Sequence, residues 1–336
     1  MQSNRDLGEG IPVRQATSQM TWVNYWDHFL ARCGVNRGGH RVEPGLYALG
    51  HPTPHSPVFV TANYTLSFDA LRSALAGIDG YILVLDTQGI NVWCAAGKGT
   101  FGTDELVRRI EAVRLSDIVS HRHLILPQLG AAGVSAHEVK RRSGFDVEYG
   151  PVRAADLPEY LKRHQATEEM RRVRFSLIDR LVLIPVELVH MFVPTLLVAI
   201  LLYAISRWLA AASAVAAILA GVVLFPILLP WLPTRDFSSK GFVLGGIVAL
   251  PFALAMFQRS AAAPLWLRLS SALACLLALP PVTAFLSLNF TGSTPITSRS
   301  GVKREIFTYV PIMAWMFGIG MLLTVGVRLF QHLGGA

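Results

Sequence analysis

The chain has 336 residues, of which 52% are hydrophobic and only 15% are charged, and its formal net charge is +8. This composition is too apolar for an ordinary soluble protein and indicates segments that span a membrane. The three cysteines, Cys33, Cys94 and Cys275, are too few for a disulfide framework or for an iron–sulfur cluster held by four cysteines. Any reaction of this chain that needs low-potential electrons must therefore receive them from another protein. The first ten residues contain no apolar run, so no cleavable signal peptide is expected.

Residues 1–165 are predicted to form an α/β domain, because strand-like and helix-like stretches alternate along them. Strands are expected at Pro57–Ala62, Tyr81–Leu85, Leu124–Leu126 and Phe145–Tyr149. Helices are expected at 67–76, capped by Ser67, at 103–113, capped by Thr103, at 135–143, opened by a Ser135/Glu138 capping box, and at 155–163. This order predicts a largely parallel, Rossmann-like sheet covered by helices. Ligands of such sheets bind beyond the carboxyl ends of the strands.

A basic linker, residues 166–180, precedes a predicted transmembrane domain, residues 181–336. Five apolar runs in this domain are long enough to cross a bilayer: Leu181–Ile205, Trp208–Pro230, Gly241–Gln258, Leu269–Leu288 and Ile306–Val327. Basic side chains before the first run are typical of a cytoplasmic juxtamembrane segment: Lys162, Arg163, Arg171, Arg172, Arg174 and Arg180. They are not interleaved with stacking aromatic residues, so nucleic-acid binding is not expected. The positive-inside rule predicts a multi-pass protein of the cytoplasmic (inner) membrane with its N-terminal domain in the cytoplasm.

The segment after the strand Tyr81–Leu85 carries the features that indicate a cofactor. Cys94 stands at the start of a predicted short helix, with Trp93 before it and three small residues, Ala95, Ala96 and Gly97, after it. A helix N-terminus favours the thiolate form, which binds soft metals, and the small residues would let a bulky group approach the backbone. A flat cofactor with one open axial position would account for all of these features. The alternative is that Cys94 is an inert, packed thiol.

The octet of residues 91–98, Asn-Val-Trp-Cys-Ala-Ala-Gly-Lys, resembles the signature of the mercury-methylating corrinoid proteins of the HgcA type. The resemblance starts near Arg41, includes residues 44–50, 60–64, 66–72 and 121–128, and extends to the five-span half of the chain. It implies that residues 1–165 form a corrinoid domain similar to that of the corrinoid iron–sulfur protein of the acetyl-CoA pathway. The cofactor would be bound base-off, with Cys94 as the lower axial ligand of cobalt. The Asp-x-His-x-x-Gly motif of the methionine-synthase type does not occur in the chain.

The same resemblance implies that Cys94 is the catalytic residue in methyl transfer from methyl-Co(III) to Hg(II). A donating thiolate would stabilise the Co(III) that remains when the methyl group leaves as a carbanion equivalent, although radical transfer is an open alternative. A ferredoxin-like partner with two four-iron clusters (HgcB type) would recycle the cobalt to Co(I), and a methyl-tetrahydrofolate-dependent system would supply the methyl group. The alternative function is that of a membrane-bound corrinoid methyl carrier in one-carbon metabolism.

Three groups of residues are expected to contact the corrinoid. The first is the octet itself, which comprises Asn91, Val92, Trp93, Cys94, Ala95, Ala96, Gly97 and Lys98. The second lies at the end of the first predicted strand and in the turn after it and comprises Thr61, Asn63 and Ser67, for which turn formation and helix capping are equal alternatives. The third follows the third predicted strand and comprises Leu126, Pro127, Gln128 and Gly130. For Lys98, simple solvation is the commoner alternative.

Other features of the sequence have competing interpretations. Residues 97–102 spell G-x-G-x-x-G, but eleven residues separate them from the preceding strand, so a nucleotide-dependent oxidoreductase is disfavoured. A membrane scaffold without a cofactor is a further alternative. In the first span, Glu187 and His190 share a helix face and are expected either to line a polar route in the bundle or to pair with each other. The polar loop from Asn289 to Glu305 is expected to dock on the corrinoid domain.

Overall fold

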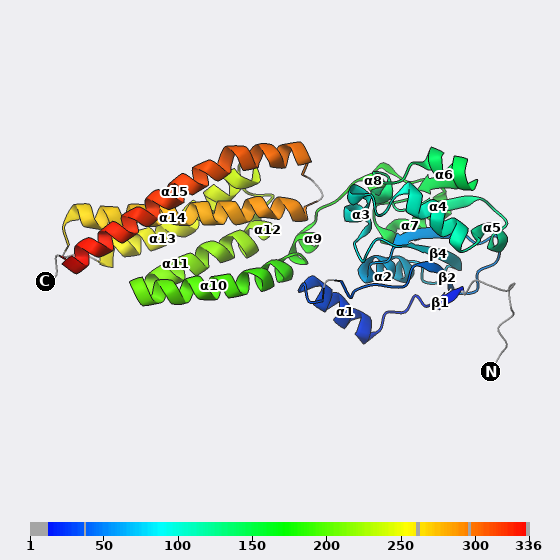
Figure 1. Ribbon diagram of the computed structural model, residues 1–336, viewed down its shortest axis with the longest axis horizontal. Coiled ribbons are helices and arrows are strands. Elements are labelled where there is room, and N and C mark those ends of the chain that lie inside the picture. Colours follow the sequence, from blue (N-terminus) through cyan, green and yellow to red (C-terminus); the bar gives the residue numbers. More distant parts are fainter. Residues whose placement is uncertain (1–12, 37, 260–262, 295–296, 334–336) are drawn as a thin grey trace. The chain divides into compact units, whose positions relative to one another are not determined.

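The computed structural model describes residues 13–36, 38–259, 263–294 and 297–333. It divides the chain into two compact units, Met1–Val173 and Arg174–Ala336 (Figure 1). The first unit contains a sheet covered by helices, and the second consists of helices. The prediction of an α/β region followed by long apolar helices is confirmed.

A six-stranded sheet runs through the described part of the first unit, in the order β1-β2-β4-β3-β5-β6. Its strands are β1 Arg14–Ala16, β2 Gly45–Leu49, β3 Val58–Ala62, β4 Gly80–Leu85, β5 His123–Leu126 and β6 Asp146–Tyr149. Every neighbouring pair is parallel except β2 with β4. The four predicted strands are β3 to β6. Strands β1 and β2 were not predicted, because β1 is too short to show a pattern and β2 follows Pro44 directly.

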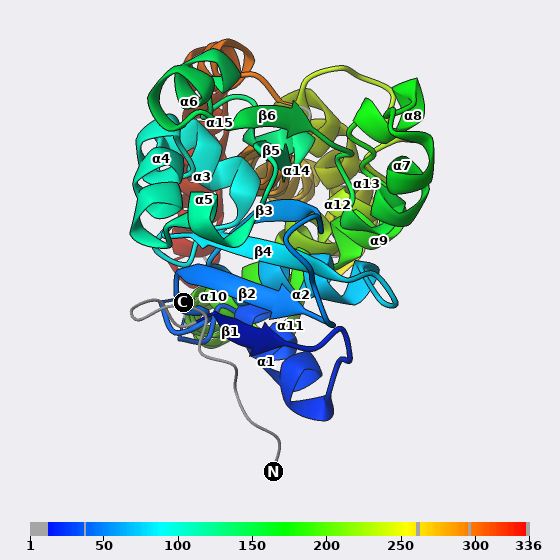
Figure 2. The ribbon, with the colours of Figure 1, turned by 90° about the vertical axis from the view of Figure 1, so that its right-hand side faces the viewer.

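Helices cover both faces of this sheet (Figure 2). One face carries α3 Val92–Lys98, α4 Thr103–Ala112, α5 Leu115–Ile118 and α6 Ala136–Ser143, and the other carries α2 Thr65–Ala74 and α7 Leu157–Arg163. Side chains along each strand alternate between the two faces, so Val60 and Leu83 pack on the first while Phe59 and Ile82 pack on the second. Shorter elements are the 3₁₀ turns η1 Gln128–Gly130 and η2 Ala154–Asp156 and the helix α8 Glu168–Arg171.

Two of the predicted helix caps are wrong, and a third stands at the predicted residue without its capping bonds. Helix α2 begins at Thr65 with Tyr64 as its N-cap, so Ser67 lies inside the first turn. Helix α4 has Gly102 as its N-cap, and the Thr103 hydroxyl oxygen instead accepts a hydrogen bond from the Ser135 backbone N–H at 2.9 Å. Ser135 does precede α6, but its side chain makes no capping bond, and Glu138 pairs with Arg141. Capping rules consider only partners close in the sequence, whereas the Thr103 hydroxyl bonds to the backbone of Ser135, the residue before α6.

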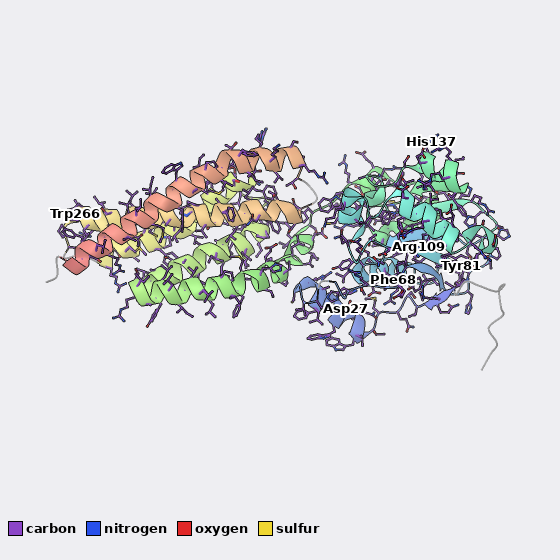
Figure 3. All side chains as sticks on the ribbon, viewed as in Figure 1. Asp27, Phe68, Tyr81, Arg109, His137 and Trp266 are labelled. Atoms are coloured by element: carbon purple, nitrogen blue, oxygen red, sulfur yellow. The ribbon has the colours of Figure 1, made fainter. Side chains whose placement is uncertain are left out.

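Helix α1, Trp22–Arg32, is held to the first unit through its polar side. His28 Nε2 lies 2.8 Å from Asp69 Oδ2, and Asp27 Oδ1 lies 2.7 Å from His40 Nδ1 (Asp27 is labelled in Figure 3). Burial raises the pKa of Asp69, but hydrogen bonds from His28 and Arg72 outweigh it and leave this pKa below its usual value. The aromatic side chains of α1 are exposed, by 79, 56, 52 and 52% respectively for Trp22, Tyr25, Trp26 and Phe29.

Within the described residues, the second unit has five helices long and apolar enough to cross a membrane: Leu177–Ser206, Trp208–Leu228, Phe237–Arg259, Leu265–Ser293 and Arg299–Gln331. The five predicted spans are therefore confirmed as helices; four are extended by a few residues at their ends, and the second ends at Leu228, two residues before the predicted Pro230. Their elements are α9 Leu177–Leu181, α10 Ile184–Ser206, α11 Trp208–Leu219, η3 Ala220–Leu224, α12 Phe225–Leu228, α13 Phe237–Arg259, α14 Leu265–Asn289, η4 Phe290–Ser293 and α15 Arg299–Leu333. The side of the membrane on which each end lies stays a prediction.

Two polar side chains of the second unit, His190 and Arg180, have other surroundings than the sequence predicted. His190 is exposed on α10, so it lies on the outside of its unit and does not line an internal route. Arg180 is buried and donates to the carbonyl oxygens of Pro226 at 2.8 Å and Ile227 at 2.7 Å. These carbonyls belong to the last turn of α12, where the helix itself offers no donor. Arg180 therefore closes a helix end and does not face headgroups.

Described residues of the predicted polar loop from Asn289 to Glu305, the last of which belong to α15, also bond within their own unit. Glu305 is buried and accepts hydrogen bonds from the backbone N–H of Ser238 at 2.9 Å and from its hydroxyl at 3.0 Å. The Thr297 hydroxyl donates to the Thr291 carbonyl oxygen at 2.9 Å. Residues 295 and 296 of this loop lie outside the described residues. Docking of the loop on the first unit stays a prediction.

Candidate functional site

The carboxyl ends of β3, β4, β5 and β6 lie at one edge of the sheet, because these strands are parallel. Helix α2, which follows β3, packs on one face, whereas the helices that follow β4 and β5 pack on the other (Figure 2). The connections from the neighbouring strands β3 and β5 thus diverge to opposite faces. This is the switch point at which α/β sheets place their ligands. All three predicted groups of site residues lie on or next to these strands.

Asn63 shapes the loop that follows β4. Its side chain is buried, and its Oδ1 accepts hydrogen bonds from the backbone N–H groups of Thr87 and Gly89, both at 3.0 Å. Its Nδ2 donates to Asp86 Oδ1 at 3.2 Å. Gln88 and Gly89 adopt positive φ angles of 59° and 72°, which the bonds to Asn63 help to hold. Asn63 therefore positions the loop after β4, which agrees with the alternative that this residue serves turn formation.

Glu105, on α4, fastens the start of the same loop. Its Oε1 accepts the backbone N–H of Asp86 at 2.9 Å, and it forms ion pairs with Arg108 and Arg109 (Arg109 is labelled in Figure 3). Burial raises the pKa of Glu105, but the bonds from Asp86, Arg109 and Arg108 outweigh it, so this pKa lies below the usual value. Sequence reasoning saw only a favourable charge in the first turn of the helix. The arginines three and four residues later were the available signal.

Replacing Glu105 with glutamine should destabilise the loop at neutral pH by about 2 kcal/mol, because Arg109 loses its buried partner. The lowered pKa means that the carboxylate contributes stability above its unfolded pKa of about 4.5. That contribution is lost as pH falls through the lower folded value. Hydrogen exchange of the Asp86 amide in the full chain, followed from pH 7 towards pH 3, should show this acid loss in wild type and not in the variant. Glu111→Gln, exposed on the same helix, is the control; an equal effect there would contradict the assignment.

Cys94 lies in the first turn of α3, as predicted. Asn91 is the N-cap of this helix, and its Oδ1 accepts the backbone N–H of Cys94 at 2.9 Å. Gly99 ends the helix in the left-handed conformation, with φ of 83°. The Cys94 side chain is half-buried, and Trp93 beside it is 38% exposed. The thiol and the indole thus stand together near the surface of a helix whose two ends are set by local sequence.

The other side of α3 is packed against the loop that follows β5. Val92, Ala95 and Ala96 are buried in the core of this face. A Cβ on Gly133 would lie 2.2 Å from the Phe101 carbonyl oxygen and 2.9 Å from the Ala96 Cα, so the two backbones touch there. The small size of the alanines serves this close packing. Exposed positions that a cofactor could approach are Trp93, Gly97 and Lys98, beside the half-buried Cys94.

Replacing Gly133 with alanine should displace α3 and destabilise the first unit by about 1–3 kcal/mol, because every near neighbour of the added methyl group is backbone. Thermal unfolding of the full chain and the cofactor content of the purified protein would both fall. Gly38→Ala is the matched control, since its Cβ would meet only the flexible end of Arg41 at 3.8 Å. Equal unfolding midpoints for the two variants would contradict this account of α3 packing.

The third predicted group lies beside α3. The turn η1 packs on α3, and within the described residues Gln128 Oε1 is buried without a hydrogen-bond partner. Leu126 and Gly130 are buried, and Pro127 is half-buried. Thr61 is buried inside β3, while Ser67 lies half-buried on α2, on the opposite face. The structure therefore places Gln128 in a turn that packs on α3, the helix of Trp93 and Cys94, and gives Asn63 a supporting role in the loop before that helix. It leaves Ser67 on the helix that packs on the opposite face.

The glycine run at residues 97–102 joins α3 to α4. A dinucleotide fingerprint must connect a strand directly to a helix, so that the helix N-terminus meets the pyrophosphate. Here Gly97 lies inside one helix and Gly102 caps the next. The run does not have the dinucleotide-binding arrangement.

Comparison with known proteins shows that the part of the chain that contains this site is similar to a known family. Residues 36–161 match the family model described as CO dehydrogenase/acetyl-CoA synthase delta subunit. The acetyl-CoA decarbonylase/synthase complex subunit gamma of Methanopyrus kandleri is 37% identical over 129 residues, which cover 38% of this chain and 28% of that protein. The corresponding subunit of Archaeoglobus fulgidus is 33% identical over 131 residues, covering 38% and 27%. The first unit is related to these subunits.

A third relative is the corrinoid/iron-sulfur protein large subunit of Moorella thermoacetica, 28% identical over 129 residues that cover 38% of this chain and 28% of that protein. The chain thus spans less than a third of the length of these three relatives. The matched region contains β2 to β6 and every candidate site residue from Thr61 to Gly130. The helices that could span a membrane lie outside it.

Proposed function

We propose that this protein is a membrane-anchored corrinoid protein that carries a methyl group between partners. The observation that carries the proposal is the similarity of 129 residues of this chain to the large subunit of a corrinoid/iron-sulfur protein, together with the family match of residues 36–161. The matched region includes a half-buried thiol at the carboxyl edge of a mostly parallel sheet. We further propose that residues 1–165 bind the corrinoid in the cytoplasm, that 166–180 form a linker, and that 181–336 anchor the protein in the inner membrane.

The residues at the site fit such a cofactor. When bound, a corrinoid supplies a cobalt that accepts and releases a methyl group. Cys94 would hold that cobalt from below, because a thiolate is a strong donor to a soft metal and its helix turn is held by Asn91. Trp93 would cover part of the flat ring with its exposed indole. Gln128 Oε1, buried and unpaired within the described chain, would accept a hydrogen bond from an amide at the edge of the ring.

The relatives' names support the proposal that this protein delivers its methyl group to an acceptor in one-carbon metabolism. Two of the relatives are gamma subunits of acetyl-CoA decarbonylase/synthase complexes, and the third is the large subunit of a corrinoid/iron-sulfur protein. A protein with this role would receive the methyl group from a methyl-tetrahydrofolate-dependent system and deliver it to a partner enzyme. Its membrane helices would hold that exchange at the membrane surface.

Mercury(II) is the second candidate acceptor, and Cys94 is the observation that favours it. The octet around Cys94 resembles the signature of mercury-methylating proteins, and the structure sets its thiol in the first turn of α3 beside an exposed tryptophan. A sulfur ligand beneath the ring would favour release of the methyl group to an electrophile. This reaction would need a ferredoxin-like partner with two four-iron clusters to supply electrons.

Anaerobic purification of the full chain with a corrinoid supply tests the proposal. We expect corrinoid absorbance and about one cobalt per chain; purified protein that binds no cobalt, or that shows flavin or nicotinamide bands, would overturn it. Isotopically labelled methyl groups loaded on the protein then separate the acceptors. Transfer to an acetyl-CoA synthase supports the one-carbon role, whereas labelled methylmercury formed from Hg(II) supports the second candidate.

A further inference from the structure

A cavity of about 560 Å³ opens between α10, α11, α13, α14 and α15 of the second unit. Most of its wall is apolar and includes Leu202, Leu209 and Met321. One end is polar and is formed by Ser206, Arg259 and Arg328. The volume falls within the roughly 300–1,000 Å³ typical of small-molecule sites. An occupant matched to this wall would be amphiphilic, with one polar head and a long apolar part.

Ser206 is a polar group without a partner at the polar end. It is 4% exposed, and within the described residues its hydroxyl oxygen has no hydrogen-bond partner. Its carbonyl oxygen accepts one bond from Arg328 Nη2 at 3.3 Å, which brings this guanidinium to the cavity. A buried hydroxyl without a partner is costly, so a bound group that pairs with it would be favoured.

Two arginines of this end also lack a carboxylate partner. Arg259 and Arg328 both line this end of the cavity, so their positive charges repel each other, and neither forms an ion pair with an acidic side chain among the described residues. Arg268, at the same end, does not line the cavity; it donates to the Phe257 carbonyl oxygen at 3.0 Å, and its guanidinium lies over the Phe257 ring at 4.1 Å. Two guanidinium groups that form no ion pair with a carboxylate, beside a hydroxyl that has no partner among the described residues, form the donor set that a phosphate group requires.

Tryptophans mark the level of this end in the bilayer. Trp208 begins α11 and Trp266 lies in the first turn of α14, and they are 63% and 50% exposed (Trp266 is labelled in Figure 3). Exposed tryptophans at helix ends sit among the headgroups. The polar end of the cavity therefore lies at headgroup level, and its apolar wall lies at the depth of the acyl chains.

We propose that this cavity binds an anionic phospholipid. Its phosphate would lie between Arg259, Arg328 and the Ser206 hydroxyl, and one acyl chain would fill the apolar part beside Leu202 and Leu209. A neutral occupant such as a quinone would leave the repulsion between the two arginines uncompensated. The lipid would join α10, α13 and α15, since Ser206, Arg259 and Arg328 come from these three helices.

The full chain, stripped of lipid in a neutral detergent, tests this site by native mass spectrometry and thermal unfolding. Dioleoyl phosphatidylglycerol should remain bound and raise the unfolding midpoint. Dioleoyl phosphatidylcholine and inorganic phosphate at the same concentration should not. Arg259→Gln combined with Arg328→Gln should weaken phosphatidylglycerol binding about tenfold or more. Equal binding of the two lipids, or an equal shift with inorganic phosphate alone, would overturn the proposal.

Two single variants separate lipid binding from folding. Ser206→Ala should weaken phosphatidylglycerol binding, while the midpoint without lipid stays the same or rises, because an unpaired buried hydroxyl is removed. Arg207→Gln changes an exposed arginine at the same end that does not line the cavity, and it should leave lipid binding unchanged. Loss of binding in Arg207→Gln equal to that in the double variant would show only a general charge effect and would refute the site.

Discussion

Alanine at position 94 should lower methyl transfer at least about 100-fold and remove the spectral signature of sulfur ligation from the bound corrinoid. The first unit should keep its fold, because Cys94 is half-buried and its backbone N–H, not its thiol, makes the bond to Asn91. The loss would arise from the missing donor beneath the cobalt. Absorption and electron paramagnetic resonance spectra of the anaerobically purified full chain, followed by single-turnover transfer to each acceptor, measure both effects.

The matched control for this change is Cys33→Ala. Cys33 is also half-buried in the first unit, at the C-terminal end of α1, and its backbone N–H bonds to the Phe29 carbonyl. Spectrum and transfer rate should be unchanged in this variant. A Cys94→Ala protein whose spectrum matches wild type would show that sulfur does not ligate the cobalt. The corrinoid assignment would then stand without the sulfur ligand, and the mercury candidate would lose its support.

Alanine in place of Asn63 should destabilise the first unit by about 2–4 kcal/mol and lower its corrinoid content. The change leaves the buried N–H groups of Thr87 and Gly89 without an acceptor, and each such loss costs about 1–3 kcal/mol. The loop that leads into α3 would then lose its shape. Thermal unfolding of the full chain and hydrogen exchange over residues 86–94 measure the two consequences separately.

Two further variants test how Asn63 acts. Asn63→Asp keeps an acceptor for both N–H groups but places a second carboxylate beside Asp86, so it should recover part of the stability and exchange protection. Ser73→Ala, on the neighbouring helix α2, should have little effect, because its hydroxyl bond is exposed and long at 3.4 Å. Unchanged protection of the Thr87 and Gly89 amides in Asn63→Ala would refute the positioning role.

The candidate site combines parts that differ in how far sequence reasoning can reach. The prediction of a short helix that starts near Cys94 is confirmed by α3, whose limits are local: Asn91 caps it and Gly99 ends it. Ala95 and Ala96 had been attributed to cofactor access, whereas they are buried where α3 meets Gly133. Glu105 was seen only as a helix-end charge, although it holds the Asp86 backbone. These contacts join elements that only the folded sheet brings together.

The sequence by itself determined the five apolar helices, the mostly parallel α/β order and the position of Cys94 at a helix start. Each depends on neighbouring residues: hydropathy summed over one run, alternation of short patterns, or a cap within three positions. The tertiary structure alone decided that Asn63 holds residues 24 to 26 positions away, and that Arg328 meets Ser206 across 122 positions. Such pairings depend on how separate elements pack, because a hydrogen bond forms wherever the fold brings donor and acceptor together, whatever their separation in the chain.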